Sequence, residues 1–491
     1  MAECRIIQSP RRLAGGLQRA DGKALSLSQP LMHMNPPVLQ IALPDTLEDT
    51  PLERWSIGDQ IEAGQPLFTT QEGVTQACPR TATVESMGTG KTLSGSPTPC
   101  RLLNLTVVDP DPPRQPSLTP LPANPDGRTL RQRAADAGIV GLGGGGFPAH
   151  LKWQHRLHTL IVNGAECEPF LTADEQTMRL RAPAIWDAVV ALMSALSLQR
   201  CVLVLEDNKP EALAALQAAY PSVLDAQDVC ITVIQSQYPS GAERQLIWLA
   251  LGLEIATTTF PVEHGIVVHN PVTLAALADA LHGYPLTDRI VTVTGPSIVT
   301  PGTFQTPLGT PIDLLLSQAG GLRPRHHNVF HGGPYTGWPI SNTAAGVRAT
   351  TACLYAAPVV SQTPSPCIRC GACAEVCPVQ LQPQQLFAAL THDQLDEALH
   401  VGLSQCLECG ACDVVCPSNL SLTKTFQDGI RDHQIQQAEK QRADRARTRF
   451  EARNQRLLKR SEADETRRAV RRERSGSALD RIRAARAEET H

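Results

Sequence analysis

The chain has 491 residues, of which 42% are hydrophobic and 4% aromatic, and its formal net charge is −4. This length predicts roughly three domains or four smaller ones, and the scarcity of aromatic residues excludes a protein built on base stacking, so we expect no nucleic-acid partner. No apolar run approaches the ~20 residues that span a bilayer, and the N-terminus lacks the apolar core of a signal peptide. Seven cysteines are scattered without pairing logic, which is typical of a reducing compartment. We therefore expect a cytoplasmic protein that is at most peripheral to a membrane.

Residues 1–115 alternate Pro/Gly turns with short apolar segments. The stretches SIGDQIEAGQPLF and TATVESMGTG predict strand–turn–strand units with corners at Gly58-Asp59 and Gly64-Gln65. This pattern resembles the barrel-sandwich hybrid fold of biotinyl and lipoyl domains. The hairpin tip has no lysine for a swinging cofactor, so we expect a structural role. A Pro-rich linker is predicted at residues 109–127.

Residues 128–285 have α/β character. LIVNGAE and CVLVLEDN are apolar runs that end in polar turns, as buried strands do, whereas APAIWDAVVALMSAL and PEALAALQAAYP have helical spacing. The next segment, residues 288–325, begins as the hairpin RIVTVTGPSIVTPGTFQTP and ends with the short helix PIDLLLSQA. It predicts a compact β-grasp-like unit.

A glycine-rich loop lies near the start of the α/β region, in VGLGGGGFPAHLKW (Val140 to Trp153). Successive glycines allow backbone N–H groups to approach a phosphate without a Cβ clash. A helix is expected to start near Pro148 and to add its positive N-terminal dipole, and Lys152 can add a full charge. A glycine-rich run alone is also typical of surface loops and linkers. It matches neither the usual dinucleotide-binding register nor a Walker loop.

Carboxylates follow this loop, in NGAECEPF (Asn163 to Phe170). Glu166 and Glu168 are two positions apart and come directly after a predicted strand, with Asn163 before them. Such groups can hydrogen-bond ribityl or ribose hydroxyls and the imide of a flavin. An acidic loop hydrated by solvent is the alternative.

Two near-identical cysteine strings, CIRCGACAEVCP and CLECGACDVVCP, lie within a domain predicted at residues 355–428. Each has the spacing C-x2-C-x2-C-x3-C-P, which holds cubane iron–sulfur clusters in bacterial two-cluster ferredoxins, where the fourth cysteine ligates the other cluster. Zinc knuckles or disulfides rarely need this full string twice with both prolines. We therefore predict two [4Fe-4S] clusters. One ligand set is Cys367, Cys370, Cys373 and Cys416, and the other is Cys406, Cys409, Cys412 and Cys377.

The last segment, residues 432–491, is predicted to be a charged helical tail. Residues 431–491 contain 18 Lys/Arg against 11 Asp/Glu. A solvated helix is one interpretation. Docking on a membrane subunit or an anionic leaflet is the other, because clustered basic residues bind such surfaces.

Several motifs in order carry a family resemblance: GLGGGGFPAHLKW, NGAECEPFLTAD, LEDNKPEA, YPSGAERQL and the doubled cysteine string. Together they resemble the C subunit of the Rnf-type (also called Rsx) ion-translocating oxidoreductase. They are similar, more distantly, to the flavin- and NADH-binding subunit of respiratory complex I. The resemblance covers residues 12 to about 430. It implies a multidomain α+β protein with a barrel-sandwich hybrid, an α/β flavin-binding domain, a soluble-ligand-binding β-grasp insert, a ferredoxin-type domain and a charged C-terminal helix.

The resemblance also implies that one FMN binds in the glycine-loop domain, accepts hydride from NADH and releases single electrons to the clusters. Carried over by position, the residues of the FMN site are Gly141, Gly143, Gly144, Gly145, Lys152, Asn163, Glu166, Gly241, Glu243, Asn270 and Thr273. The NADH contacts are Phe147, on the adenine, and Glu168, on the nicotinamide ribose. Leu142 and Ala165 stand where the complex I subunit has an Arg and an Asp, so its full contact set does not transfer.

The function implied is that of a peripheral electron-transfer subunit on the cytoplasmic face of the inner membrane. Its expected partners are integral membrane and flavin-bearing subunits of the same translocase and a ferredoxin-like subunit. A soluble NADH-dependent flavin/iron–sulfur reductase, such as a cobalamin reductase, is the alternative, and a scaffold whose clusters merely bridge partner proteins is a third.

Overall fold

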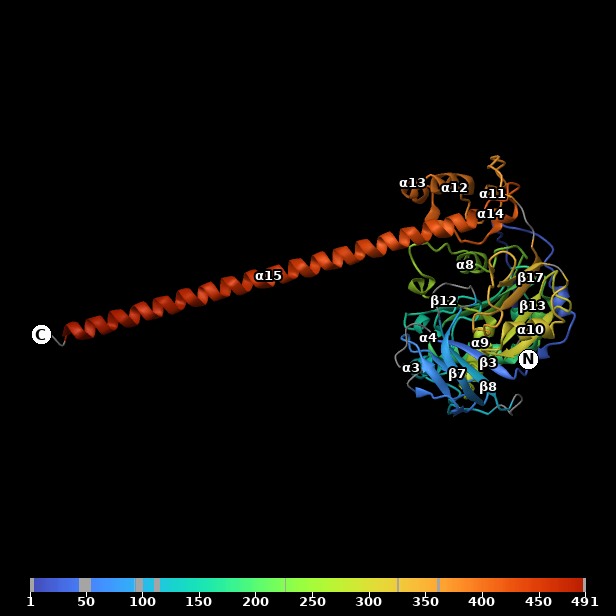
Figure 1. Ribbon diagram of the computed structural model, residues 1–491, viewed down its shortest axis with the longest axis horizontal. Coiled ribbons are helices and arrows are strands. Elements are labelled where there is room, and N and C mark those ends of the chain that lie inside the picture. The colour runs from blue at the N-terminus through green and yellow to red at the C-terminus, as the bar shows by residue number, and fades with distance from the viewer. Residues whose placement is uncertain are drawn as a thin grey trace.

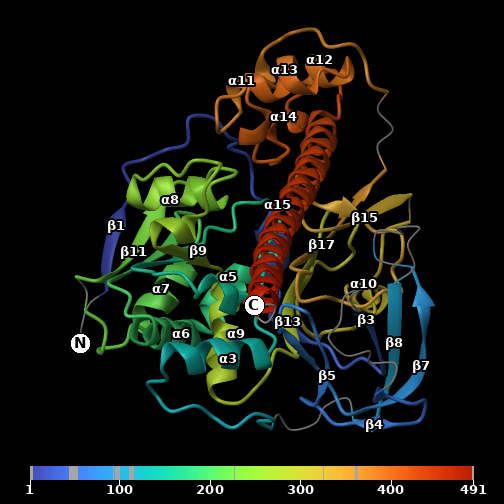
Figure 2. The same cartoon turned by 90° about the vertical axis from the view of Figure 1, so that its left-hand side faces the viewer.

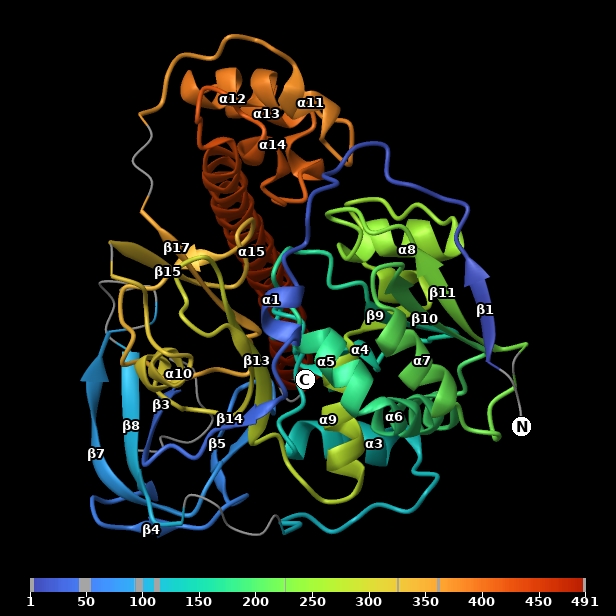
Figure 3. The same cartoon turned by 90° about the vertical axis from the view of Figure 1, so that its right-hand side faces the viewer.

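The computed structural model describes residues 4–43, 54–91, 93, 100–109, 115–225, 227–324, 326–359 and 363–488. Three sheet-based units form the body of the molecule, and the cysteine-rich domain lies at one end of this body (Figure 1). A single long helix extends from the cysteine-rich domain into solvent. Figures 2 and 3 show the body from two opposite sides.

The N-terminal unit consists of two small antiparallel sheets. One has the strand order β3 (Val38–Leu43), β8 (Cys100–Val107), β7 (Ala82–Gly90) and β4 (Gln60–Ile61). The other pairs β5 (Pro66–Thr69) with β6 (Thr75–Ala77). Both predicted corners are turns, with φ of +91° at Gly58 and +80° at Gly64. The all-β character is as predicted, and the finer assignment to a barrel-sandwich hybrid stays a prediction.

The first strands of the chain do not join this N-terminal unit. β1 (Arg5–Gln8) pairs in parallel with β11 (Val229–Ile234), and β2 (Met32–His33) pairs with β14 (Gly302–Pro307). Between them lies the short helix α1 (Ala24–Leu27). The prediction that one domain spans residues 1–115 is therefore corrected for residues 5–33, because these short edge strands find their hydrogen-bond partners on other sheets.

The α/β unit has a five-stranded parallel sheet in the order β1, β11, β10 (Arg200–Glu206), β9 (Thr159–Gly164) and β12 (Ile266–His269). Its strands are apolar on both faces, as strands buried between helices are. The helices α3 (Gly127–Asp136), α5 (Ala173–Leu180), α6 (Ala182–Ala195), α7 (Pro210–Ala218) and α9 (Pro271–Leu281) share one apolar core with Leu160 and Val162.

The other face of this sheet presents Ile161 and Val202 to α8 (Glu243–Leu251). α4 (Ala149–Lys152), which starts directly after Pro148 as predicted, packs against α3, and the 3-10 turn η1 (Pro261–His264) lies against β12. Open sheets of this kind bind ligands outside the carboxyl ends of their strands. The loops at that edge are therefore expected to form the ligand-binding site.

The third unit is a six-stranded sheet in the order β16 (Trp338–Pro339), β15 (His327–His331), β17 (Cys353–Pro358), β13 (Asp288–Thr294), β14 and β2. The predicted hairpin is confirmed, since β13 and β14 are antiparallel with Asp288 opposite Pro307. The predicted helix is also present, as α10 (Ile312–Gln318). The sheet continues past the predicted limit of 325, because β15 and β17 complete it.

The cysteine-rich domain contains α11 (Ala372–Glu375), α12 (Pro383–Thr391), α13 (Leu395–His400), the 3-10 turn η2 (Leu403–Gln405) and α14 (Ala411–Val414). α11 and α14 start directly after Gly371 and Gly410, whose φ values are +84° and +74°. This left-handed conformation favours glycine, and it lets each cysteine string turn sharply into its helix.

The long helix α15 (Leu422–Glu488) begins inside this domain, where Leu422 and Phe426 are buried. From Glu439 to Arg483 all of its side chains are exposed, in agreement with the predicted charged tail. Across the residues that the structure describes, no helix has both the length and the apolar character needed to cross a membrane.

Candidate functional site

The glycine loop forms a closed turn at the edge of the α/β unit. The Gly141 N–H donates to the Phe147 carbonyl (2.8 Å) and the Gly146 N–H to the Gly141 carbonyl (2.9 Å). A Cβ added at Gly144 or Gly145 would meet no protein atom within 4 Å, whereas one at Gly143 would lie 3.0 Å from Nδ2 of Asn270. The loop therefore packs against Asn270 on one side and faces open space on the other, as a phosphate cradle must.

Two residues at the start of α9 hold this loop in place. The Leu142 N–H donates to Oγ1 of Thr273 (2.9 Å), which is buried. Asn270 accepts from the Val272 N–H (2.9 Å) as the N-cap of α9, and its Nδ2 donates to Oδ2 of Asp174 (2.5 Å). Asn270 and Thr273, both predicted at the site, thus support the loop through their side chains.

Lys152 connects α4 to the ends of two other elements. Its Nζ donates to the Val268 carbonyl of β12 (3.1 Å) and lies 3.6 Å from Oε1 of Glu243, the first residue of α8. Its side chain is about a quarter exposed, so the ammonium can still face a ligand. Phe147 is 51% exposed and its ring is free to stack.

Asn163 joins the end of β9 to the loop after β11. Its Nδ2 donates to the Gly241 carbonyl (2.9 Å), and the Gly241 N–H donates to Sγ of Cys167 (3.2 Å). The structure therefore brings the predicted residues of the glycine loop, of β9 and of the loops after β11 and β12 to one edge of the sheet. These residues fit an FMN: a glycine cradle with one open side, an ammonium beside it and amide groups at strand ends.

The two predicted carboxylates are already engaged within the protein. Glu166, with φ of +41°, accepts the Asp174 N–H (2.8 Å) and the Glu175 N–H (3.2 Å), so it caps α5. Glu168 accepts the backbone N–H groups of Tyr335 (2.8 Å) and Thr336 (2.9 Å). In this arrangement their oxygens hold loops together, which differs from the expectation that they reach a flavin or a ribose.

A buried lysine that no sequence motif predicted lies beneath this turn. Lys23 is 4% exposed, and its Nζ donates to the carbonyls of Glu166 (2.8 Å) and Leu171 and lies 3.8 Å from Oε2 of Glu166. A second unpredicted pair is Lys209 and Glu206, which are 3.1 Å apart and fully buried. Lys23 could not be recognised from local pattern, because its partners lie more than 140 residues away in the sequence, whereas Lys209 pairs with a residue only three positions before it.

Asp174 is the buried acid of this network. Burial, together with the charge of Glu166, raises the pKa of Asp174 to about 7, against the lowering effects of Asn270, Arg289 and Lys23. The folded protein therefore binds a proton that the unfolded chain releases above pH 4, and this contribution to stability is lost as the pH rises toward 7.

We expect the free energy of unfolding of wild type, relative to that of the Asp174→Asn variant, to fall by about 1–2 kcal/mol between pH 5.5 and 8. Urea unfolding followed by tryptophan fluorescence measures it, since Trp153 and Trp186 are buried in this unit. Asp187→Asn, an exposed site on α6, is the control and should follow wild type. If the difference in free energy of unfolding between wild type and Asp174→Asn stays constant from pH 5.5 to 8, the raised pKa of Asp174 is contradicted.

In the cysteine-rich domain, four thiols line one small cavity: Cys377, Cys406, Cys409 and Cys412. The same cavity is lined by Leu381, Leu407 and Phe426. This is the second predicted ligand set, including the cysteine that the other string supplies. Sulfur donors in an apolar surround fit a cubane cluster. Burial raises the pKa of Cys406 to about 12, so cluster insertion must release its proton.

The other predicted set is more open. Cys367 and Cys370 are exposed, Cys373 is buried and Cys416 is partly buried. Cys373 and Cys416 lie in the same apolar cluster, and the segment before Cys367 is tied to Ser418, whose Oγ donates to the Pro366 carbonyl (3.0 Å). Within the described part of the chain, no three His, Cys, Asp or Glu side chains are arranged to hold a single metal ion.

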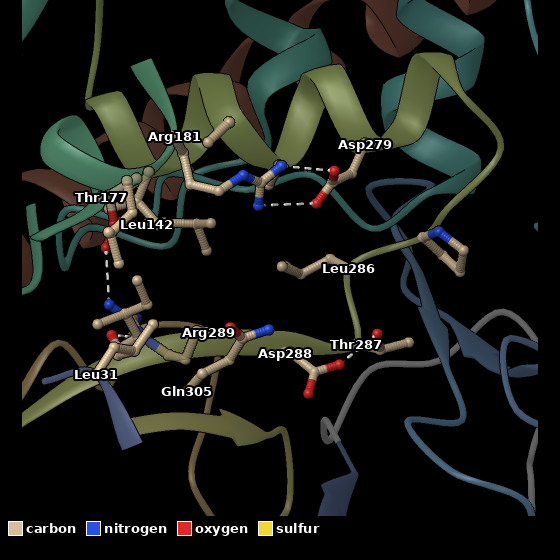
Figure 4. Close-up of a pocket in the computed structure, with 16 residues that line it drawn as sticks. Leu31, Leu142, Thr177, Arg181, Asp279, Leu286, Thr287, Asp288, Arg289 and Gln305 are labelled. Atoms are coloured by element: carbon tan, nitrogen blue, oxygen red, sulfur yellow. Dashed lines mark hydrogen bonds and ion pairs between the residues drawn. The ribbon is translucent and has the colours of Figure 1, made fainter. Parts of the chain in front are cut away.

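A separate cavity lies behind the glycine loop, between α5, α9 and β13 (Figure 4). Leu142, Arg289 and the ion pair of Arg181 with Asp279 (2.7 Å) line it. It contains none of the residues predicted for the FMN site, and Leu142 turns its side chain into it.

Comparison with known families assigns three segments. Residues 134–279 match the description Nuo51 FMN-binding domain, residues 290–339 SLBB domain and residues 363–420 4Fe-4S dicluster domain. The chain is therefore a multidomain α/β protein with these three domains. The predicted flavin-binding, soluble-ligand-binding and iron–sulfur domains are confirmed at this level.

Among curated proteins, the chain is similar to the C subunit of the ion-translocating oxidoreductase complex of Pseudomonas aeruginosa, with 40% identity over 353 residues, 70% of this chain and 44% of that protein. The protein of the same name from Erwinia tasmaniensis is 37% identical over 459 residues, 90% of this chain and 56% of that protein. The chain spans about half the length of these relatives. A solved NAD+-reducing [NiFe]-hydrogenase in the H2-reduced state aligns with a TM-score of 0.45 at 19% identity, over 63% of this chain and 61% of that chain, a likeness too loose to bear on function.

Proposed function

Since the chain is related to the C subunits of ion-translocating oxidoreductase complexes, as its motifs predicted, we propose that it is a peripheral electron-transfer subunit of such a complex. The observation that carries this proposal is the glycine loop with one open side, in a body that directly contacts a domain with two cysteine strings. The relatives are named as complex subunits, which favours this function over a soluble reductase.

FMN would supply the conversion between a two-electron hydride donor and one-electron clusters. The loop from Gly141 to Gly145 would bind its phosphate and ribityl chain, with Lys152 as the counter-charge, and Asn163, Gly241 and Glu243 would surround the ring. Asn270 and Thr273 would position the loop from behind. The protein's own contribution is to fix these groups before the ligand binds, so that little ordering remains to be done.

NADH is the proposed hydride donor or acceptor. Phe147 supports this, because its ring is half exposed and it directly follows the glycine loop. Glu168 would act through the loop at Tyr335 and Thr336 that it holds, since its oxygens are engaged there. The proposed partners are integral membrane and flavin-bearing subunits and a ferredoxin-like subunit, and the proposed location is the cytoplasmic face of the inner membrane.

The test is cofactor analysis of anaerobically purified chain followed by NADH titration. We expect one FMN and about eight irons per chain, as two cubane clusters require, with flavin and cluster absorbance bleached on addition of NADH. Four or fewer irons would contradict the two-cluster assignment. Full cofactors without bleaching would instead contradict the NADH role and favour a bridging scaffold.

A further inference from the structure

The contact between the cysteine-rich domain and the body involves one of the two predicted cluster sites. Tyr238, in the loop after β11, donates through its hydroxyl to the Cys409 carbonyl (2.5 Å). The Gly16 N–H donates to the Val376 carbonyl (2.7 Å). A Cβ added at Gly15 would lie 2.6 Å from the Cys377 carbonyl oxygen, which shows how closely the backbones approach.

Cys377 and Cys409 are far apart in sequence, yet both belong to the set that lines the small cavity. An apolar cluster seals this contact. Leu17, Tyr238 and Ala411 are buried in it, and Val376, Cys409, Val414 and Val415 pack around them. The ring of Tyr335 lies edge-on to that of Tyr238, with 4.9 Å between centroids. The approach is therefore a packed interface, in which water does not separate the two domains.

The same loop reaches the predicted FMN site. Tyr238 directly precedes the turn Pro239–Ala242, which contains Gly241 and is closed by the Ala242 N–H donating to the Pro239 carbonyl (3.0 Å). Gly241 in turn accepts from Asn163 and donates to Cys167. One side chain and one short turn thus connect the loops of the FMN site to the backbone of Cys409.

Among the residues that the structure describes, the other cysteine set shows no comparable contact with the body. Cys367 and Cys370 are exposed, and Ile368 between them is 68% exposed. The preceding residues, Ser365 and Pro366, are hydrogen-bonded to Ser418 in the same domain. Of the two sets, this is therefore the one that a partner protein can approach directly.

We propose that the two cluster sites have a fixed order. Cys377, Cys406, Cys409 and Cys412 form an inner site, which electrons enter from the FMN loops through the Tyr238 contact. Cys367, Cys370, Cys373 and Cys416 form an outer site, which faces a one-electron partner protein. The order depends on the proposed function, in which NADH yields NAD+, one proton and two electrons, so that one NADH reduces both clusters of one chain.

The test compares Cys409→Ser with Cys370→Ser in the full chain, each reconstituted anaerobically with FMN, iron and sulfide. Iron content and the EPR signal after dithionite establish that one cluster remains. We expect NADH to reduce the remaining cluster of Cys370→Ser at the wild-type rate. In Cys409→Ser, NADH should bleach the flavin. It should not reduce the remaining cluster within the time that wild type needs to reduce its clusters. Equal rates, or the reverse order, would overturn the proposal.

A second readout needs neither NADH nor a substitution. An added dysprosium chelate, which stays in water, should speed the relaxation of one dithionite-reduced cluster signal of wild type far more than the other. The sensitive signal should be the one that survives in Cys409→Ser. Sensitivity of the other signal, or equal sensitivity of both, would overturn the order. Failure of NADH to bleach the flavin of wild type would contradict the proposed function alone, because the relaxation result stands without it.

Discussion

Replacing Gly143 with valine is expected to abolish most FMN binding while the chain stays folded. A Cβ at this position would lie 3.0 Å from Nδ2 of Asn270 and 3.2 Å from its Cβ and Cγ, and φ at Gly143 lies outside the left-handed region. The two extra methyl groups must therefore displace Asn270 or the loop. Overpacking of this kind costs about 1–3 kcal/mol. If this cost reduces the free energy of FMN binding, FMN affinity falls by about 10- to 100-fold.

Gly88→Val, on β7 of the N-terminal unit and outside the proposed site, is the matched control. A Cβ there meets no protein atom within 4 Å, and φ is again outside the left-handed region, so this variant should keep FMN. Fluorescence titration of the apoprotein with FMN measures both affinities, and unchanged iron content shows that the cysteine-rich domain remains intact. Equal affinities for the two variants would mean that the loop is not positioned by Asn270.

Local pattern was most informative where the predicted chemistry lies in short motifs. The cysteine strings predicted both ligand sets, and the cavity lined by Cys406, Cys409, Cys412 and Cys377 supports the second of them. The glycine loop predicted a turn with open backbone and a helix after Pro148, which α4 confirms. Buried strands were recognised because a sheet covered on both faces requires continuous apolar runs.

Sequence pattern failed where partners are distant along the chain. Lys23 and Tyr238 donate hydrogen bonds to groups more than a hundred residues away. The residues next to them in the sequence form no pattern that predicts these contacts. The family resemblance assigned Glu166 to the flavin, and the fold adds the N–H groups of Asp174 and Glu175 at the start of α5 as donors to its carboxylate. Short edge strands such as β1 and β2 carry too few residues to show which sheet they will join.

Replacing Lys23 with methionine is expected to lower the free energy of unfolding by about 3–5 kcal/mol, the usual cost of removing one partner of a buried ion pair. Methionine preserves much of the apolar stem, so the loss comes from the ammonium. The carbonyls of Glu166, Glu168 and Leu171 lose their donor, and the carboxylate of Glu166, whose side chain is 3% exposed, loses its counter-charge. Urea unfolding at pH 7 measures the change.

Lys424→Met is the control, because Lys424 pairs with Asp428 on α15 with both side chains about half exposed or more, and such pairs contribute about 0–1 kcal/mol. A double-mutant cycle with Glu166→Gln isolates the charge. If the unpaired carboxylate causes the loss, Lys23→Met should cost at least about 1 kcal/mol less in the Glu166→Gln background, within the range of couplings between contacting residues. Equal costs in both backgrounds would assign the whole effect to the three carbonyls, and a cost as small as that of Lys424→Met would show that Lys23 does not hold the turn after β9.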